Sequence, residues 1–211
     1  TKKLYVTNMV TLETSMNILL SMVKPSLTLD ELESILFDIG MELEDVQDDV
    51  LKIDITAERP DMVSTYGLAR ALRAYLKKKN PTYTAKKSTY KVIIDKSVKN
   101  VRPFTACAVV KNIIFDDEKI KEVIWVQEKL HSTFGRNRKK AAIGIYPLEH
   151  ITFPITFKAD KPENISFVPL ESIKEMSALE ILQKHPTGQE YAHLLEGFDT
   201  YPFFVDANNN I

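Results

Sequence analysis

A capped amphipathic helix near the N-terminus constrains the fold more than any other feature of this chain. Thr28 and Glu31 have the spacing of a capping box, in which each side chain binds the backbone of the other residue. Four apolar residues then recur at helical spacing, namely Leu32, Ile35, Leu36 and Ile39. Gly40 follows as a helix stop. A helix with one apolar face must bury it, so the segment 28–39 is predicted to pack into a globular core.

Elements that could pack against this helix follow it directly in the sequence. Residues 50–56 alternate between apolar and polar side chains, which predicts a strand, and the polar turn Ala57–Asp61 comes next. Ser64 is placed to cap a second helix. The composition of residues 80–89 then shifts to Lys, Thr, Ser and Pro without periodicity, which is typical of a linker. We therefore predict a small helix-strand-helix unit over residues 1–85.

The remaining chain, residues 90–211, is predicted to form a larger mixed α/β module, which makes the fold class α+β. Apolar runs predict strands at residues 91–95, 106–114, 141–145, 155–158 and 201–206. A helix is expected over residues 116–134, with a core stripe of Ile120, Ile124, Leu130 and Phe134 and a left-handed stop at Gly135. Ser177 with Glu180, and Thr187 with Glu190, have capping-box spacing. The last strand has no following partner, so the module is expected to be truncated at Ile211.

Four cations follow the 116–134 helix within five residues, namely Arg136, Arg138, Lys139 and Lys140. They lie on a connection between a predicted helix and a predicted strand, and such loops commonly carry function. Two interpretations stay open. The run is either a solvated helix end that favours the helix dipole, or a site that contacts phosphate groups.

Composition excludes several classes of function. The formal net charge of -1 argues against a surface that attracts nucleic acid as a whole, so an RNA contact would be local. The single cysteine, Cys107, lies in an apolar run and is expected to be a small core residue. No run approaches membrane-spanning length and no signal-peptide pattern is present, so a cytoplasmic location is expected. The four histidines lack metal-ligand spacing, and neither a metal site nor a catalytic residue is predicted.

Three segments in order resemble the N-terminal part of the beta subunit of phenylalanyl-tRNA synthetase, in its archaeal and eukaryotic cytosolic form. The first is the segment 55–72, which contains Arg59-Pro-Asp61 and Gly67-Leu-Ala-Arg70. The second joins Arg102-Pro-Phe104 to Gln127-Glu-Lys-Leu-His131, the basic run and Ala142-Ile-Gly144. The third runs from His185 to Leu195 and continues to Tyr201-Pro202 and Val205-Asp206. Together they span nearly the whole chain.

The resemblance implies a part of an aminoacyl-tRNA synthetase, a ligase of protein biosynthesis. That family forms a heterotetramer with an alpha subunit and joins phenylalanine to tRNA(Phe), with ATP and magnesium as cofactors in the whole enzyme and none in this chain. Residues 1–85 are similar to its first alpha/beta unit, and residues 90–211 to the front part of the domain that hydrolyses mischarged tyrosyl-tRNA. The family's pocket continues beyond Ile211, so the fragment alone is expected to be inactive.

The resemblance also implies roles for individual residues. Arg136, Arg138, Lys139 and Lys140 are candidates to contact tRNA phosphates, and Phe104, Gly144 and Tyr146 are candidates for the edge of the editing pocket. Tyr146-Pro147 stand where archaeal relatives often carry His and Asp. This substitution leaves open a non-catalytic RNA-binding module or a subunit-docking module as the alternative function.

Overall fold

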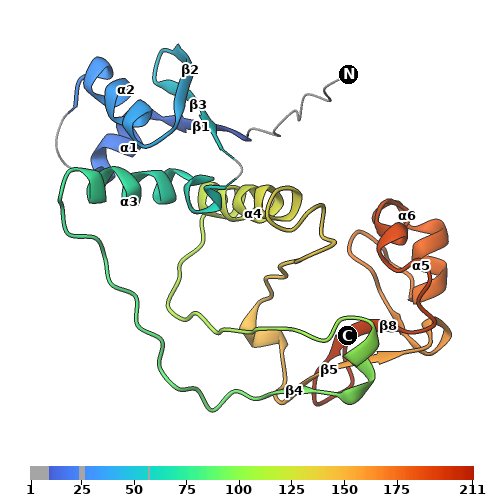
Figure 1. Ribbon diagram of the computed structural model, residues 1–211. Helices are drawn as coiled ribbons and strands as arrows, with labels where there is room; N and C mark the ends of the chain where they lie inside the picture. Colours follow the sequence, from blue (N-terminus) through green and yellow to red (C-terminus); the bar gives the residue numbers. More distant parts are fainter. Residues whose placement is uncertain (1–9, 24–26, 57) are drawn as a thin grey trace, which may run out of the picture. The chain divides into compact units, whose positions relative to one another are not determined.

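The computed structural model describes residues 10–23, 27–56 and 58–211. Both helices and strands occur in each part of the chain, which confirms the mixed α/β class (Figure 1). Contacts divide the chain into one unit of residues 1–84 with 114–143, and another of residues 85–113 with 144–211. The predicted domain limits of 1–85 and 90–211 stay a prediction, and Ala57 of the predicted polar turn lies outside the described residues.

The first unit contains a three-stranded antiparallel sheet. Its strands are β1 (Val10–Ser15), β2 (Glu42–Gln47) and β3 (Val50–Ile55), in the order β1-β3-β2. The central strand β3 confirms the predicted strand at residues 50–56. Leu51, Ile53 and Ile55 of this strand are fully buried, so one face of the sheet forms part of the hydrophobic core.

Three helices of the first unit supply the rest of its core. They are α1 (Met16–Val23), α2 (Leu29–Asp38) and α3 (Thr65–Tyr75), and the short helix η1 (Pro60–Met62) precedes α3. The capping box of Thr28 and Glu31 is present, and Ser64 caps α3 by accepting from the Gly67 N–H. Leu32, Leu36, Leu68 and Leu72 are fully buried, and the helical spacing of the first two predicted their burial.

Helix α4 (Asp117–Ser132) also belongs to the first unit. Asp116 caps it, and Val126 and Leu130 pack against the core. The predicted core stripe is wrong in part, because Ile120, Ile124 and Phe134 are exposed by 44%, 54% and 51%. The buried side of α4 is the one that carries Val126 and Leu130, so Ile120 and Ile124 lie on another side of the helix.

The second unit is built on the sheet β4-β5-β8. Strand β4 (Val92–Ile94) is parallel to β5 (Ile155–Asp160), and β8 (Tyr201–Val205) is antiparallel to β5. These strands confirm three of the predictions. The buried apolar residues of this unit are few, and those described are Val98, Phe157, Ile165 and Val205. Phe157 also stacks on Phe204, with ring centroids 4.5 Å apart.

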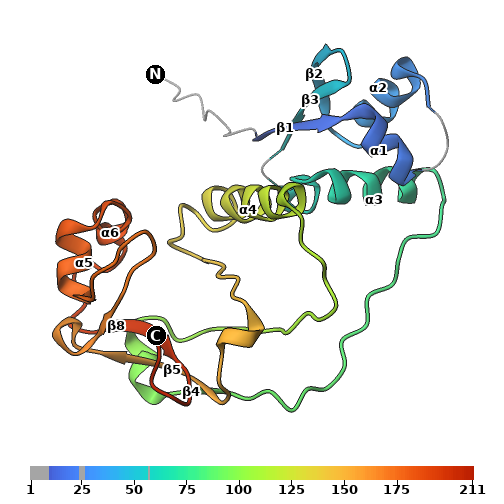
Figure 2. The ribbon, with the colours of Figure 1, turned by 180° about the vertical axis from the view of Figure 1, so that it is seen from behind.

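A second, two-stranded sheet leads into a pair of short helices. Strands β6 (Ser166–Phe167) and β7 (Met176–Ser177) precede α5 (Ala178–Lys184) and α6 (Pro186–Tyr191), which lie side by side in Figures 1 and 2. Ser177 and Glu180 form the predicted capping box. The predicted box at Thr187 is wrong, because α6 starts at Pro186 and Thr187 lies inside it. The remaining short helices are η2 (Lys96–Asn100), η3 (Leu148–His150), η4 (Pro162–Asn164) and η5 (Ala192–Leu194).

Two predicted strands are wrong. The segments 106–114 and 141–145 have no strand pairing within the described chain, and Cys107 is exposed rather than buried. Apolar composition alone does not make a strand, because the backbone also needs a partner that runs alongside it. Among the helices that the structure describes, none is long and apolar enough to cross a membrane.

Candidate functional site

The basic connection after α4 has an unusual backbone. Arg136, Asn137 and Arg138 are consecutive and have φ angles of 52°, 52° and 65°. Asparagine tolerates this left-handed region, whereas arginine disfavours it by roughly 1–2 kcal/mol per residue. Non-glycine residues in this region persist only when the surrounding structure holds them there, and they cluster at functional sites.

The backbone of this connection forms the cap of α4. The N–H groups of Gly135, Arg136, Asn137 and Arg138 donate to the carbonyls of Leu130, Thr133, Ser132 and His131, respectively. The carbonyls at a helix C-terminus otherwise lack partners. The left-handed turn therefore stabilises the helix end, and its own N–H groups are already used.

Gly135 does not serve as the predicted left-handed stop. Its φ angle is not among the positive values, and the three residues after it adopt that conformation instead. A Cβ at position 135 would lie 2.6 Å from the Ala141 carbonyl oxygen and 2.7 Å from the His131 carbonyl oxygen. Gly135 is therefore required by the close approach of two backbone segments.

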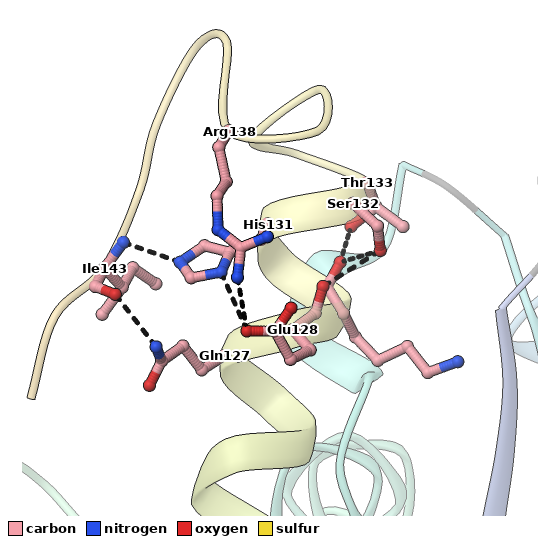
Figure 3. Close-up of polar contacts among 8 residues, drawn as sticks. Gln127, Glu128, His131, Ser132, Thr133, Arg138 and Ile143 are labelled. Atoms are coloured by element: carbon pink, nitrogen blue, oxygen red, sulfur yellow. Dashed lines mark hydrogen bonds and ion pairs between the residues drawn. The ribbon is translucent and has the colours of Figure 1, made fainter. Parts of the chain in front are cut away.

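Glu128 connects the turn to the helix (Figure 3). Its Oε1 accepts a hydrogen bond from Arg138 Nη2 at 2.7 Å and lies 3.3 Å from His131 Nδ1. The side chain of His131 is 4% exposed and that of Arg138 is 21% exposed. The Glu128 side chain is 48% exposed, so this ion pair is only partly shielded from solvent.

Gln127 and His131 bind the other end of the connection. The Ile143 N–H donates to His131 Nε2 at 2.7 Å, and Gln127 Nε2 donates to the Ile143 carbonyl at 3.0 Å (Figure 3). Both polar groups of the Ile143 backbone are thereby satisfied by side chains of α4. At Ile143, this pairing satisfies the two backbone groups that a strand partner would otherwise bind.

The four basic residues that the sequence singled out divide into two pairs. Arg138 is bound to Glu128, and Lys140 Nζ lies 4.2 Å from the centroid of the Phe134 ring. Arg136 and Lys139 are exposed, and their side chains have no hydrogen bond or ion pair within the described ranges. The turn therefore leaves the side chains of Arg136 and Lys139 free to meet a ligand, whereas those of Arg138 and Lys140 contact other side chains of the protein.

Glu122, also on α4, has its carboxylate in an unfavourable environment. Burial raises the pKa of Glu122 above its ordinary value, and its Oε1 is buried without a hydrogen-bond partner. Near the start of the helix, by contrast, a hydrogen bond from Lys119 lowers the pKa of the Asp116 carboxyl. No cluster of three potential metal ligands occurs among the residues that the structure describes.

The candidate pocket-edge residues belong to the second unit. Gly144 and Tyr146 lie together, since a Cβ on Gly144 would come within 2.6–2.9 Å of the Tyr146 ring. Phe104 is 89% exposed and Tyr146 is 68% exposed, and no ring contact of Phe104 occurs in the described part of the chain. Gly144 and Tyr146 are thus in contact, whereas Phe104 projects into solvent.

The charged group after β3 has a structural role. Arg59 Nε and Nη2 donate to the two carboxylate oxygens of Asp61, each at 3.0 Å, and Arg70 lies 4.0 Å from the same carboxylate. The hydrogen bonds from Arg59 lower the pKa of Asp61. A Cβ on Gly67 would lie 2.0 Å from the Asp61 carbonyl oxygen, so Gly67 allows α3 to approach this turn.

The sequence did not predict the hydrogen bonds that Gln127 and His131 form with the backbone of Ile143. Gln127 and His131 are four residues apart, so they share one side of α4. Polar side chains at this spacing near the end of an amphipathic helix were the available signal. Their backbone partner lies 12 to 16 residues away in sequence and could not be identified without the structure.

Comparison with known proteins assigns the family. Residues 9–78 match the model of the phenylalanyl-tRNA synthetase beta subunit B1 domain. Along most of its length the chain is also similar to phenylalanine–tRNA ligase beta subunits, with 41% identity to that of Methanosphaera stadtmanae over 184 residues and 43% to that of Archaeoglobus fulgidus over 175 residues. The chain belongs to the phenylalanyl-tRNA synthetase beta-subunit family. The resemblance of the three sequence segments is thereby confirmed.

The fold of this family member matches a solved structure. An N-terminal fragment of the phenylalanyl-tRNA synthetase beta-subunit from Pyrococcus horikoshii superimposes with a TM-score of 0.84 at 33% identity. The match covers 95% of this chain and 60% of that fragment. The aligned regions cover 86% and 82% of this chain but only 33% and 32% of the two curated relatives, so the chain spans about a third of their length.

Proposed function

We propose that this chain serves a phenylalanine–tRNA ligase by contacting tRNA phosphates through the turn 136–140. The observation that carries the proposal is the run of three left-handed residues that presents Arg136 and Lys139 to solvent. A strained backbone that is fixed by its surroundings is typical of a functional site. The family membership supplies the partner class, because its relatives are named as ligases that act with tRNA.

The charge of the chain supports a local contact. The formal net charge is -1, so association cannot depend on a basic surface as a whole. The backbone N–H groups of the turn already donate to carbonyls, which leaves the side chains of Arg136 and Lys139 to bind phosphate. Arginine and lysine are the residues that commonly contact phosphate oxygens.

The proposal includes a supporting role in proofreading. A pocket for phenylalanine discriminates poorly against an analogue that only adds a hydroxyl, so such a ligase needs a second site for hydrolysis. Residues 90–211 would form the front part of that editing domain, with Phe104, Gly144 and Tyr146 at the pocket edge. The chain itself contributes no catalytic residue and is proposed to be inactive alone.

The remaining chemistry is assigned to the complex. An alpha subunit would bind ATP and magnesium and would attach phenylalanine to tRNA(Phe) in a heterotetramer located in the cytoplasm. The beta subunit, of which this chain resembles about a third, would support that reaction.

A subunit-docking role is the second candidate. Ile120 and Ile124 lie on an exposed side of α4, and a partner subunit that covered them would bury apolar surface. A chain that only docks would lose no tRNA affinity when the turn is neutralised.

Binding to a tRNA(Phe) transcript at several salt concentrations tests the proposal. The double variant Arg136→Ala/Lys139→Ala should bind more weakly and should lower the salt slope by roughly 1.4–1.8, which is about 0.7–0.9 for each phosphate contact. The matched control Lys86→Ala/Lys87→Ala removes the same charge from an exposed segment and should retain the slope. Equal slopes for wild type and the Arg136/Lys139 variant would reject the phosphate contact.

A further inference from the structure

The connection that carries the two exposed cations is bound at both of its ends by α4. At its start, the N–H groups of residues 135–138 donate to the helix carbonyls. At its end, Gln127 and His131 bind the backbone of Ile143. We infer that Gln127 and His131 form a two-point clamp that positions Arg136 and Lys139 for the RNA backbone. This inference rests on the proposed function of the turn.

The two hydrogen bonds to Ile143 have the pattern that one residue forms in a β-ladder. In an antiparallel ladder, a hydrogen-bonded residue exchanges both its N–H and its C=O with the opposite strand. Ile143 finds its acceptor in His131 Nε2 and its donor in Gln127 Nε2 instead. Because Gln127 and His131 are four residues apart, they lie on the same side of the helix and can form hydrogen bonds with both backbone polar groups of one residue.

The hydrogen bonds fix the tautomer of His131. Nε2 accepts from the Ile143 N–H, so it must carry the lone pair, and the ring hydrogen of the neutral imidazole lies on Nδ1. Nδ1 faces Glu128 Oε1, which also accepts from Arg138. His131 therefore connects the end of the clamp to the ion pair that holds the left-handed turn (Figure 3).

This connection gives the clamp its role as a positioning device. Arg136 and Lys139 lie between the two anchored ends, and neither contacts Gln127 or His131 through a hydrogen bond or an ion pair within the described residues. A turn that is already ordered loses less conformational freedom when it binds a phosphate backbone. Gln127 and His131 would thus affect affinity without contributing charge.

Two clamp variants and one rescue variant test the inference. His131→Phe keeps a ring but removes the acceptor for Ile143, and Gln127→Leu removes the donor. Each should weaken binding of a tRNA(Phe) transcript about 3–10-fold, which corresponds to the ordering of one or two side chains. The salt slope should stay at the wild-type value, because both phosphate-binding cations remain. The Ile143 amide should exchange faster with solvent in His131→Phe.

His131→Gln is the rescue variant, since its side-chain oxygen can reach the position of Nε2. It should bind within about twofold of wild type and should restore protection of the Ile143 amide. Ile53→Val is the control for general destabilisation, because Ile53 is fully buried on β3. At a temperature where it stays folded, this control should bind the transcript as wild type does.

The outcomes separate the two proposals. If Arg136→Ala/Lys139→Ala binds as wild type does, the phosphate contact itself is rejected. If that variant is weaker but His131→Phe and Gln127→Leu retain full affinity, the clamp does not position the turn and this inference alone is overturned. A His131→Gln variant as weak as His131→Phe would likewise overturn the assigned acceptor role, whereas the expected rescue supports it.

Discussion

Arg138 donates to Glu128 Oε1 at 2.7 Å from a backbone position that is itself left-handed, with φ of 65°. The ion pair thereby joins the strained part of the turn to a side chain on the last turns of α4. The strain and the contact are parts of one arrangement, because the guanidinium reaches Glu128 from this folded-back connection (Figure 3). Removing the ion pair should therefore affect both the stability of the turn and its conformation.

A double-mutant cycle on Glu128→Gln and Arg138→Gln measures this pair. The side chains are 48% and 21% exposed, so we expect a coupling free energy of about 0.5–1 kcal/mol at low salt, and less in 1 M salt. The pair Lys184 and Glu180 in the second unit is the comparison, because Lys184 is 62% exposed whereas Arg138 is 21% exposed, and its coupling free energy should be smaller. Chemical unfolding provides the free energies. A coupling of zero for Glu128 and Arg138 would contradict the assignment.

Arg136→Gly should separate stability from binding. Glycine adopts positive φ freely, so the change relieves roughly 1–2 kcal/mol of backbone strain and loses part of that gain to unfolded-state entropy. We expect the free energy of unfolding to rise by about 0.5–1 kcal/mol while tRNA affinity falls. Arg136→Ala is the control, because it removes the same charge but retains a Cβ, and it should lose affinity without gaining stability. A destabilised Arg136→Gly variant would argue against the strained conformation.

Local signals predicted α2, α3, α4 and α5 because the causes of these helices lie within a few residues. The caps at Thr28, Ser64 and Ser177 are present where short-range spacing placed them. A strand depends instead on a partner distant in sequence. For this reason the prediction of strands at residues 106–114 and 141–145 from composition alone is wrong, because neither segment has strand pairing in the described chain.

The candidate site was predictable to the same limited extent. The charge cluster and its place after a helix could be read from the sequence, whereas the division into bound and exposed cations could not. That division depends on where the chain folds back, which places Arg138 near Glu128 ten residues earlier. The sequence correctly indicated that Gly135 matters at the helix end. The reason is the close approach of the Ala141 and His131 backbones, however, and not a positive φ angle at Gly135.

Gly135→Ala tests this steric role. The added methyl would overlap two carbonyl oxygens, so the turn must shift, and we expect a loss of about 1–3 kcal/mol in the free energy of unfolding. Gly144→Ala is the matched control, because the three atoms nearest its methyl all belong to the exposed side chain of Tyr146, which can move away. Thermal unfolding of both variants provides the comparison. Similar losses for the two substitutions would count against the crowding at position 135.

Glu122→Gln should stabilise the first unit in a way that depends on pH. Burial raises the pKa of Glu122 in the folded state above the ordinary value of 4.5, so the folded protein binds a proton more tightly than the unfolded chain. Ionisation therefore destabilises the fold progressively as the pH rises from about 4.5 through the raised pKa, and the full penalty remains at higher pH. At pH 7 the neutral variant should be more stable by about 0.5 kcal/mol, a value reduced because the side chain is partly exposed.

The difference between the variant and wild type should shrink as the pH falls through the raised pKa of Glu122 and should vanish below 4.5, because the carboxyl group then becomes protonated in both states. Urea unfolding at several pH values measures it. Glu118→Gln is the control, because Glu118 is exposed on the first turn of the same helix, where its charge favours the helix dipole. This control should be slightly less stable than wild type at pH 7. A Glu122→Gln variant that is destabilised at neutral pH would show that the carboxylate has a partner in solution and that its burial carries no penalty.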